Sequence, residues 1–432
     1  MPEPDRLAAL AQPLFRIPGF TIYLSGRFLL GLINRAQVIA VGYHIYEITN
    51  NPIALGYVGI SMFLPMVGFG LFAGDIADRV NRAIVLTVAM VFVAISSAGL
   101  FALAINDVRI AWSFYACIAL FGTALSFARP AIPAFIAQIV PPGQLSNAIA
   151  LSSGTSQMAS VIGPAAIGAL LIAGPAVAYL TLMTIAIVAA IMWMRLRSYA
   201  AGQVKTRGSE TTLARIAVGV RIVMRTPLIL GVMTLDLFAV FLGSVVALLP
   251  VFARDILMIG PAGLGLLRAA PAVGGAMMAV VLARITIRSH VGPIMLAGVG
   301  VFGVAIMVFG LSRNLSLSLF ALAISGAADM LSNVLRNTTI QLSAPDAIRG
   351  RVNSVSQVFV SGSNELGDFR AGVSAGLLGT IPAVMIGGIG SIAVAALWSW
   401  IFPSLRKLDR LSDLPGNAKT AAKYNNGAPV PP

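Results

Sequence analysis

The 432-residue chain is 58% hydrophobic and only 10% charged. Soluble globular domains average about 25% charged residues, so the composition excludes an ordinary water-soluble protein and indicates a polytopic membrane protein. The net charge of +14 does not predict a nucleic-acid partner, because the basic residues fall mostly in short gaps between apolar runs. One cysteine and two histidines, without an HExxH-like cluster, exclude a disulfide framework and disfavour a metal or haem enzyme, so no cofactor and no metal are expected.

Apolar runs of about 20 residues are long enough to cross the hydrocarbon core of a bilayer. The sequence contains twelve such runs, and each predicts a transmembrane helix. In chain order they cover residues 20–44, 53–73, 83–105, 109–132, 145–173, 176–196, 227–252, 261–285, 293–311, 315–341, 351–379 and 382–402. Asn51-Pro52 and Gly260-Pro261 read as helix starts, and Gly174-Pro175 separates the fifth run from the sixth.

The longest internal gap, 197–226, splits the twelve spans into six and six. We therefore expect a cytoplasmic N-terminal segment at 1–19, a six-helix bundle at 20–196, a cytoplasmic linker at 197–226, a second six-helix bundle at 227–402 and a disordered tail at 403–432. The linker stretch LARIAVGVRIVMRTP is compatible with an amphipathic helix on the membrane surface and equally with a solvated connection.

Lysine and arginine set the expected orientation. If the N-terminus lies inside, the even-numbered gaps, the linker and the tail are cytoplasmic, and they hold most of the basic residues. The outer gaps hold only Arg109, Arg254 and Arg313. This asymmetry predicts a multi-pass membrane protein with both termini in the cytoplasm.

Short similarities between the two halves indicate an internal repeat. PMVG at 65–68 in the second span corresponds to PAVG at 271–274 in the eighth. PPGQLSNAIALSSGTSQ at the fifth span corresponds to APDAIRGRVNSVSQ at the eleventh. Two pseudo-symmetric six-helix bundles are what alternating access requires, because one central site must open to each side in turn.

The stretch GDIADRVNRA, between the second and third spans, fits the pattern G-x-x-x-D-R-x-x-R at Gly74, Asp78, Arg79 and Arg82. A tight reversal between two helices favours glycine, and a carboxylate at the membrane surface can bind the positive N-terminal end of a facing helix. The pattern resembles the signature loop of the major facilitator superfamily. That resemblance implies that Asp78 docks on the start of the eleventh span and pairs with an arginine of the fourth, for which Arg129 is the candidate. The alternative is a solvated loop that only fixes orientation.

The stretch ASVIGPAAIG, residues 159–168 in the fifth span, carries Gly163, Pro164 and Gly168. These residues resemble part of the superfamily's antiporter signature, although Ala159 and Ile167 stand where the signature has glycine. The resemblance favours export, and the alternative is ordinary packing of small residues. The stretches SGRF, ADRVNR, RGRVNSV and SNELGDF resemble the branch that contains the bacterial enterobactin exporters.

Polar residues inside the spans are the best candidates for binding substrate or protons, because each costs free energy unless it faces a partner or water. The candidates are Arg27, Asn34, Arg35, Asp236, Asp329, Arg336, Glu365 and Asp368. Arg27, Asn34, Arg35 and Asp236 are expected to line a central cavity between spans 1, 4, 7 and 10. At least one of the four carboxylates is predicted to exchange protons, whereas Arg336 and Arg370 are expected in structural ion pairs.

The spans predict an all-α polytopic membrane protein, and the resemblance implies the major facilitator fold in a monomer of the bacterial inner membrane. We expect a secondary active exporter of a small amphipathic, siderophore- or drug-like molecule, driven by proton antiport. The basic groups of the first span would suit an anionic substrate. The alternatives are a proton-coupled importer with the same fold and a non-transporting receptor or scaffold. An enzyme is not expected, because the spans contain no paired nucleophile and base.

Overall fold

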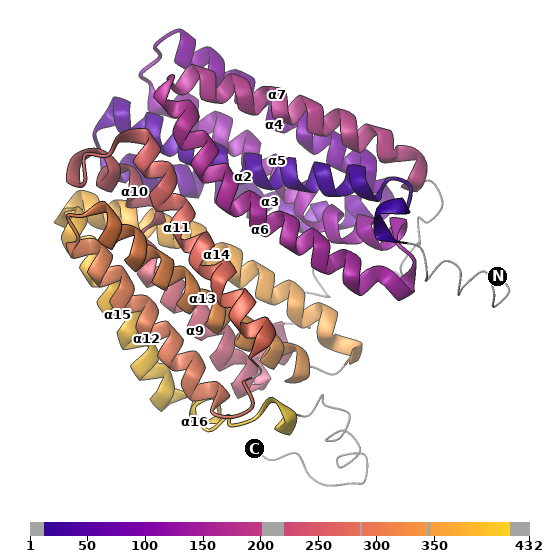
Figure 1. Cartoon of the computed structure of the whole chain (residues 1–432), viewed down its shortest axis with the longest axis vertical. Coiled ribbons are helices and arrows are strands. Elements are labelled where there is room, and N and C mark those ends of the chain that lie inside the picture. Colours follow the sequence, from indigo (N-terminus) through magenta and orange to yellow (C-terminus); the bar gives the residue numbers. More distant parts are fainter. Residues whose placement is uncertain (1–12, 201–219, 286, 344–345, 415–432) are drawn as a thin grey trace, which may run out of the picture. The chain divides into compact units, whose positions relative to one another are not determined.

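The computed structural model describes residues 13–200, 220–285, 287–343 and 346–414, and these residues form helices without any strand (Figure 1). The predicted all-α fold class is therefore confirmed. The chain divides into two compact units. Unit 1 comprises Met1–Thr212 and Ile259–Ala269, and unit 2 comprises Leu213–Met258 and Ala270–Pro432. Most of the expected linker, residues 201–219, lies outside the described part.

Six long helices form most of unit 1. They are α2 (Phe20–Thr49), α3 (Pro52–Arg79), α4 (Arg82–Ile105), α5 (Ala111–Ile139), α6 (Leu145–Ile172) and α7 (Pro175–Arg195). Short 3-10 turns lie at η1 (Leu14–Arg16), η2 (Pro142–Gln144) and η3 (Leu196–Ala200). The Asn51 side chain accepts a hydrogen bond from the Ile53 N–H at 2.9 Å, so Asn51 and Pro52 start α3 as their residue types predict.

The sequence-based placement of Gly74 in a tight reversal is wrong. α3 continues through Gly74 to Arg79, and a Cβ on Gly74 would meet no atom within 4 Å. The chain reverses later, at Val80 and Asn81, where the Asn81 side chain accepts the N–H of Ala83 and caps α4. The polar residues after position 73 therefore extend the helix instead of ending it, because nothing in this stretch forbids helical backbone.

Unit 2 contains four long helices besides the seventh and eighth expected spans. They are α12 (Val291–Leu311), α13 (Leu315–Ser343), α14 (Asp346–Leu378) and α15 (Thr380–Ile401). The eighth span is α11 (Gly260–Arg284), whose first turns belong to unit 1.

The seventh span is interrupted, which the apolar run at 227–252 did not predict. It consists of α9 (Pro227–Gly243), η4 (Val246–Leu248), α10 (Leu249–Val251) and the π-helical turn η5 (Phe252–Ile256). Pro250 has no N–H for the carbonyl one helical turn before it, and its ring disfavours a straight helix there.

Eleven helical segments of the described residues are long and apolar enough to cross a membrane. The remaining expected span, the 33-residue α14, is not among them. It carries Glu365, Asp368 and Arg370 within six residues, and these charges lower its apolar character.

The two units repeat the same helix pairings. In unit 1, α4 packs on α7, α3 on α5 and α2 on α6; in unit 2, α12 packs on α15 and α9 on α14 (Figure 1). A Cβ on Gly122 of α5 would collide with the Met62 carbonyl of α3, and a Cβ on Gly326 of α13 would collide with the Pro271 carbonyl of α11. The pairing of α3 with α5 in unit 1 is therefore matched by the pairing of α11 with α13 in unit 2.

The expectation of disorder from residue 403 onward is wrong for residues 403–414. This segment contains α16 (Pro403–Arg406) and η6 (Leu411–Asp413), and its leucines Leu405, Leu408 and Leu414 are buried in the core of unit 2. It also caps α12: the N–H groups of Val291 and Gly292 donate to the carbonyls of Asp409 and Leu408 at 3.1 and 2.8 Å. Residues 415–432 lie outside the described part.

Candidate functional site

In unit 1, α2 and α6 bring polar side chains together in two matching steps. The Arg27 guanidinium donates to the Ser156 hydroxyl at 2.9 Å, and the Tyr23 hydroxyl lies 3.1 Å from that of Ser152. Tyr23 and Arg27 are four residues apart on α2, and Ser152 and Ser156 are four residues apart on α6. The two contacts between the helices therefore lie about one helical turn apart. The Nε of Arg27 is buried and has no hydrogen-bond partner among the described residues.

Small residues hold α2 and α6 close enough for these contacts. A Cβ on Gly31 would lie 2.9 Å from the Ala159 Cβ, and one on Gly163 would lie 3.2 Å from the Leu32 carbonyl oxygen. Of the other two candidates on α2, Asn34 is partly buried and Arg35 is exposed within this structure.

The antiporter-like stretch of α6 makes a second close approach. A Cβ on Gly168 would lie 2.8 Å from the carbonyl oxygen of Pro261 and 2.8 Å from the Cα of Gly265. Both neighbours belong to the first turns of α11, in the part of that helix assigned to unit 1. Gly163 and Gly168 therefore pack against different helices, and Pro164 lies between these two contacts.

Unit 2 contains a buried ion pair. Asp236 of α9 contacts the Arg336 guanidinium of α13, and the two side chains are only 8% and 3% exposed. Burying two charges is costly unless they neutralise each other, so this pair ties α9 to α13. Asp236 and Arg336 were predicted as separate candidates. They are 100 residues apart in the sequence, so no local pattern could have predicted that they form a pair.

The interruption of the seventh span is held by α14. Arg370 donates from Nε to the Phe241 carbonyl at 3.0 Å and from an Nη atom to the Ser244 carbonyl at 3.1 Å. The Ser244 hydroxyl donates to the Asp368 carboxylate at 2.5 Å. A helix that ends inside a membrane leaves its last carbonyl groups without hydrogen-bond donors. The Arg370 guanidinium donates hydrogen bonds to two of these carbonyls. The expected ion-pair role for Arg370 is thus replaced, in this structure, by carbonyl capping.

Asp329 differs from the other carboxylates. It lies on α13 two turns before Arg336, is partly buried, and makes no hydrogen bond or ion pair to any residue in the described ranges. Glu365 is also partly buried and precedes Asp368 by three residues on α14. Three of the four predicted carboxylates therefore have different environments: Asp236 is in an ion pair, Asp368 accepts from a hydroxyl, and Asp329 has no polar partner among the described residues.

The predicted latch residues are described only in part. Arg82 donates to the Ala134 carbonyl of α5 at 3.1 Å, and Arg79 and Arg129 are exposed. The side chains of Asp78 and of residues 346–349 at the start of α14 lie outside the described set, so contact between them stays a prediction.

Sequence reasoning missed four residues at these contacts: Tyr23, Ser152, Ser156 and Ser244. A signal for three of them was present in the matching four-residue spacings of Tyr23 with Arg27 and of Ser152 with Ser156. The described residues contain no group of three or more His, Cys, Asp or Glu side chains that could hold a metal ion.

Comparisons with known proteins agree with this architecture. The model of the transmembrane secretion effector family matches residues 6–424. The enterobactin exporter of Citrobacter koseri is 27% identical over 425 residues, which cover 93% of this chain and 96% of the exporter. The enterobactin exporter of Escherichia coli O81 is 27% identical over 413 residues, covering 90% and 93% of the two chains.

Solved structures show the same fold at low identity. A bacterial homolog of the human lysosomal transporter Spinster aligns with a TM-score of 0.67 and 15% identity, covering 94% of this chain and 97% of its own. A D-xylose–proton symporter aligns with a TM-score of 0.68 and 15% identity, covering 90% and 98%. The protein is a multi-pass secondary transporter and not an enzyme, and it belongs to the transmembrane secretion effector family of the major facilitator superfamily.

Proposed function

We propose that this protein exports a small amphipathic organic molecule, siderophore- or drug-like, by alternating access, and that protons moving inward drive the export. Relatives named as enterobactin exporters match over nearly the whole chain and support this direction of transport. The antiporter-like stretch at Gly163, Pro164 and Gly168 supports it from the sequence.

The observation that carries the substrate class is the double row on α2 and α6. Arg27 supplies a positive charge inside a membrane helix, and its buried Nε retains an unused donor. The partly buried Ser156 supplies a hydroxyl group beside the guanidinium, and the buried Tyr23 and Ser152, bonded to each other, join the two helices one turn away. Cationic and hydroxyl donors together favour a ligand with acidic or phenolic oxygen atoms over a cationic drug. Asn34 and Arg35, about two turns beyond Arg27 along α2, would extend this surface.

For proton coupling, the three carboxylate environments favour Asp329. A carboxyl group without a cationic partner can take up or release a proton without breaking an ion pair. Protonation of Asp236 would instead leave Arg336 charged and buried, at a cost of several kcal/mol. We therefore assign Asp329 as the proton-exchanging group and the Asp236–Arg336 pair as the link that holds α9 to α13. Glu365 and Asp368 are the secondary candidates.

The test measures uptake of enterobactin, and of a panel of anionic amphipathic compounds, into inside-out vesicles containing the protein. Outward transport in the cell becomes uptake in these vesicles, so an acid-inside gradient should accelerate it. The Asp329→Asn variant should lose this acceleration and keep uptake driven by the substrate gradient alone. Asp107→Asn, the same change at an exposed loop carboxylate, should behave as wild type.

Each part of the proposal can fail separately. Equal uptake with and without the pH gradient would remove proton coupling. A normal response of Asp329→Asn would move the proton site to another carboxylate. Accumulation of the compound by intact cells that express the protein would replace export with import.

A further inference from the structure

A cavity of about 510 Å³ lies in unit 1 where α4 begins and α7 ends. Cavities of about 300–1,000 Å³ are typical of small-molecule sites. Because both helices are long and apolar enough to span the membrane, their ends lie at the level of the lipid headgroups. The cavity is lined by Asn81, Ile84, Met194, Arg195, Arg197 and Ser198.

Asn81 fixes the walls of this cavity. Its side-chain oxygen accepts the Ala83 N–H at 2.9 Å, and its amide nitrogen donates to the Arg197 carbonyl at 3.2 Å. The start of α4 is thereby tied to η3, the turn that follows α7. Leu196, which lies between Arg195 and Arg197 in the sequence, is fully buried and anchors the turn to the core. The amide nitrogen of Asn81 keeps a second hydrogen for a ligand.

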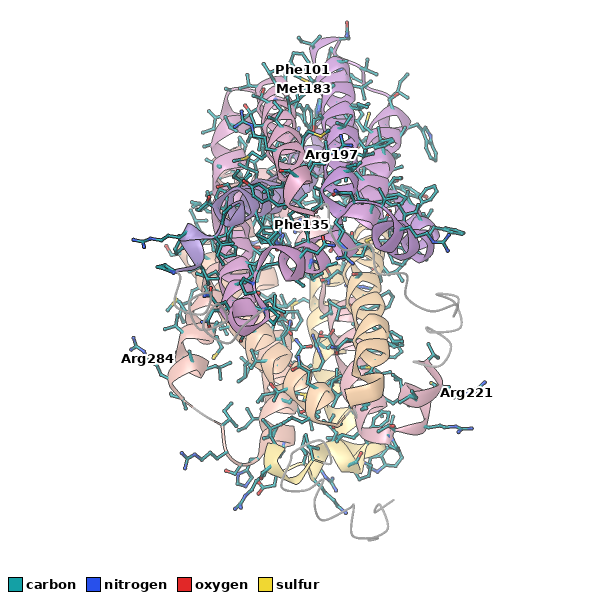
Figure 2. The ribbon with its side chains drawn as sticks, turned by 90° about the vertical axis from the view of Figure 1, so that its right-hand side faces the viewer. Phe101, Phe135, Met183, Arg197, Arg221 and Arg284 are labelled. Atoms are coloured by element: carbon teal, nitrogen blue, oxygen red, sulfur yellow. The ribbon has the colours of Figure 1, made fainter. Side chains whose placement is uncertain are left out.

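The described residues that line the cavity carry only positive charge. Arg195 and Arg197 are exposed, and neither guanidinium makes a hydrogen bond or ion pair to the described part of the protein (Figure 2 labels Arg197). None of the described residues that line the cavity is acidic. Two free guanidinium groups, an amide and the Ser198 hydroxyl form a donor set that suits a phosphate group.

An apolar surface begins at the same place. Met194 of the cavity is 47% exposed, and the row continues along α7 to Ile191 and Ile187, which are 52% and 45% exposed. On α4 the matching row is Val88, Val91 and Ile95, with exposures of 47%, 45% and 54%. The two helices pack side by side, so the rows form one apolar face that leads away from the charged cavity (Figure 1).

We propose that this cavity binds the phosphate group of an anionic phospholipid, with the acyl chains lying on the apolar face of α4 and α7. A soluble phosphate compound would contact only the arginine-lined cavity, whereas a phospholipid would contact both the cavity and the apolar face. The cavity lies on the side that the distribution of basic residues predicts as cytoplasmic, where anionic lipids attract arginine. The site is separate from the polar rows of α2 and α6.

The test compares thermal unfolding of the purified full-length protein in detergent supplemented with phosphatidylglycerol or with phosphatidylcholine. A ligand that binds the folded state raises the apparent unfolding temperature. With wild type, phosphatidylglycerol should raise the unfolding temperature more than phosphatidylcholine does. The Arg195→Gln/Arg197→Gln variant should lose more than half of this difference between the two lipids. The charge-conserving Arg195→Lys/Arg197→Lys variant should retain most of it.

The matched control is Arg284→Gln/Arg288→Gln, which removes two exposed positive charges from unit 2 (Arg284 is labelled in Figure 2). This control should keep the full phosphatidylglycerol shift, and an equal loss there would show general surface attraction and overturn the site. An unchanged shift in Arg195→Gln/Arg197→Gln would also overturn it. Soluble glycerol 3-phosphate that reproduces the whole shift would overturn the lipid assignment.

A measurement on wild type alone keeps the proposal testable if the glutamine variant fails to fold. Raising the salt concentration should reduce the phosphatidylglycerol shift, because ion pairs at an exposed site are screened. A shift that does not change with salt would contradict the proposed role of the two guanidinium groups.

Discussion

The polar interiors of the two units are built from different chemistry. Deep in unit 1, Gln37 donates to the Ser96 hydroxyl at 2.9 Å and accepts from the Ser97 hydroxyl at 3.1 Å. This cluster is fully buried and neutral. At the centre of unit 2, Asp236 faces Arg336 and Arg370 caps the end of α9. Around Gln37 the helices are joined by uncharged hydrogen bonds, whereas charged side chains join α9 to α13 and α14 in unit 2.

The two kinds of polar contact respond differently to pH. Amide and hydroxyl groups keep the same hydrogen-bonding capacity at every physiological pH. Carboxylates change both charge and donor capacity when they take up a proton. A protonation step can therefore alter the helix contacts of unit 2, while the Gln37 cluster stays indifferent to it. The comparison favours unit 2 as the part of the chain that senses protons.

The largest effect should come from breaking the buried ion pair. Asp236→Ala leaves the Arg336 charge buried without its partner and should lower the free energy of unfolding by about 3–5 kcal/mol. The double variant Asp236→Leu/Arg336→Met removes both charges and should recover most of this loss. Chemical unfolding in detergent measures both. A single variant as stable as wild type would show that this pair does not hold unit 2.

The next effect concerns the interrupted seventh span. Arg370→Gln loses both charged hydrogen bonds to α9 and should destabilise unit 2 by about 2–3 kcal/mol. The freed carbonyls belong to residues 241 and 244, so amide hydrogen exchange should rise locally over residues 241–248. Arg370→Lys can reach one carbonyl at a time and serves as the graded control. Unchanged exchange in the glutamine variant would contradict the capping role.

In unit 1 the effect should be smaller and independent of pH. Gln37→Leu deprives the Ser97 hydroxyl of its acceptor and should cost about 1–2 kcal/mol. Because the cluster contains no titratable group, the loss should be the same in mildly acidic and mildly alkaline buffer. Unfolding measured in the two buffers checks this. A loss that varies with pH would break the contrast drawn between the units.

The smallest effect should come from an ion pair that water surrounds. Asp107 and Arg109, in the loop between α4 and α5, are 78% and 73% exposed and lie 3.1 Å apart. Asp107→Asn should change the free energy of unfolding by less than about 0.5 kcal/mol. Compared with Asp236→Ala in the same assay, it isolates burial as the cause of the difference. Comparable losses in the two variants would refute that explanation.

The sequence predicts the helices well because the length of each apolar run is set by the thickness of the membrane. The starts at Pro52, Pro175 and Pro227 follow local signals, since proline at the first turn fits a helix start. The interruption after Gly243 escaped prediction because the residues on both sides are apolar, and Pro250 was its single local sign.

The site was predictable in its residue types and not in its contacts. The position of Asp236 and Arg336 within their apolar runs gives their depth in the membrane. Their pairing depends on how α9 and α13 are rotated about their axes. Arg370 was expected in an ion pair, yet it donates to backbone carbonyls that are free to accept only because α9 stops early. The folded segment after residue 403 carried a readable signal: leucines at every third position, 405, 408, 411 and 414.

That segment has a consequence for the order in which the protein can be completed during synthesis. The N–H of His290, at the start of α12, donates to the Asp409 carboxylate at 2.7 Å across 119 residues of sequence. A ribosome makes α12 long before it makes the residues that cap it. A chain that stopped at Phe402 would contain every membrane helix and would still leave the first N–H groups of α12 without these partners. The capping of the first N–H groups of α12 by these residues can therefore form only after the rest of unit 2 has been synthesised.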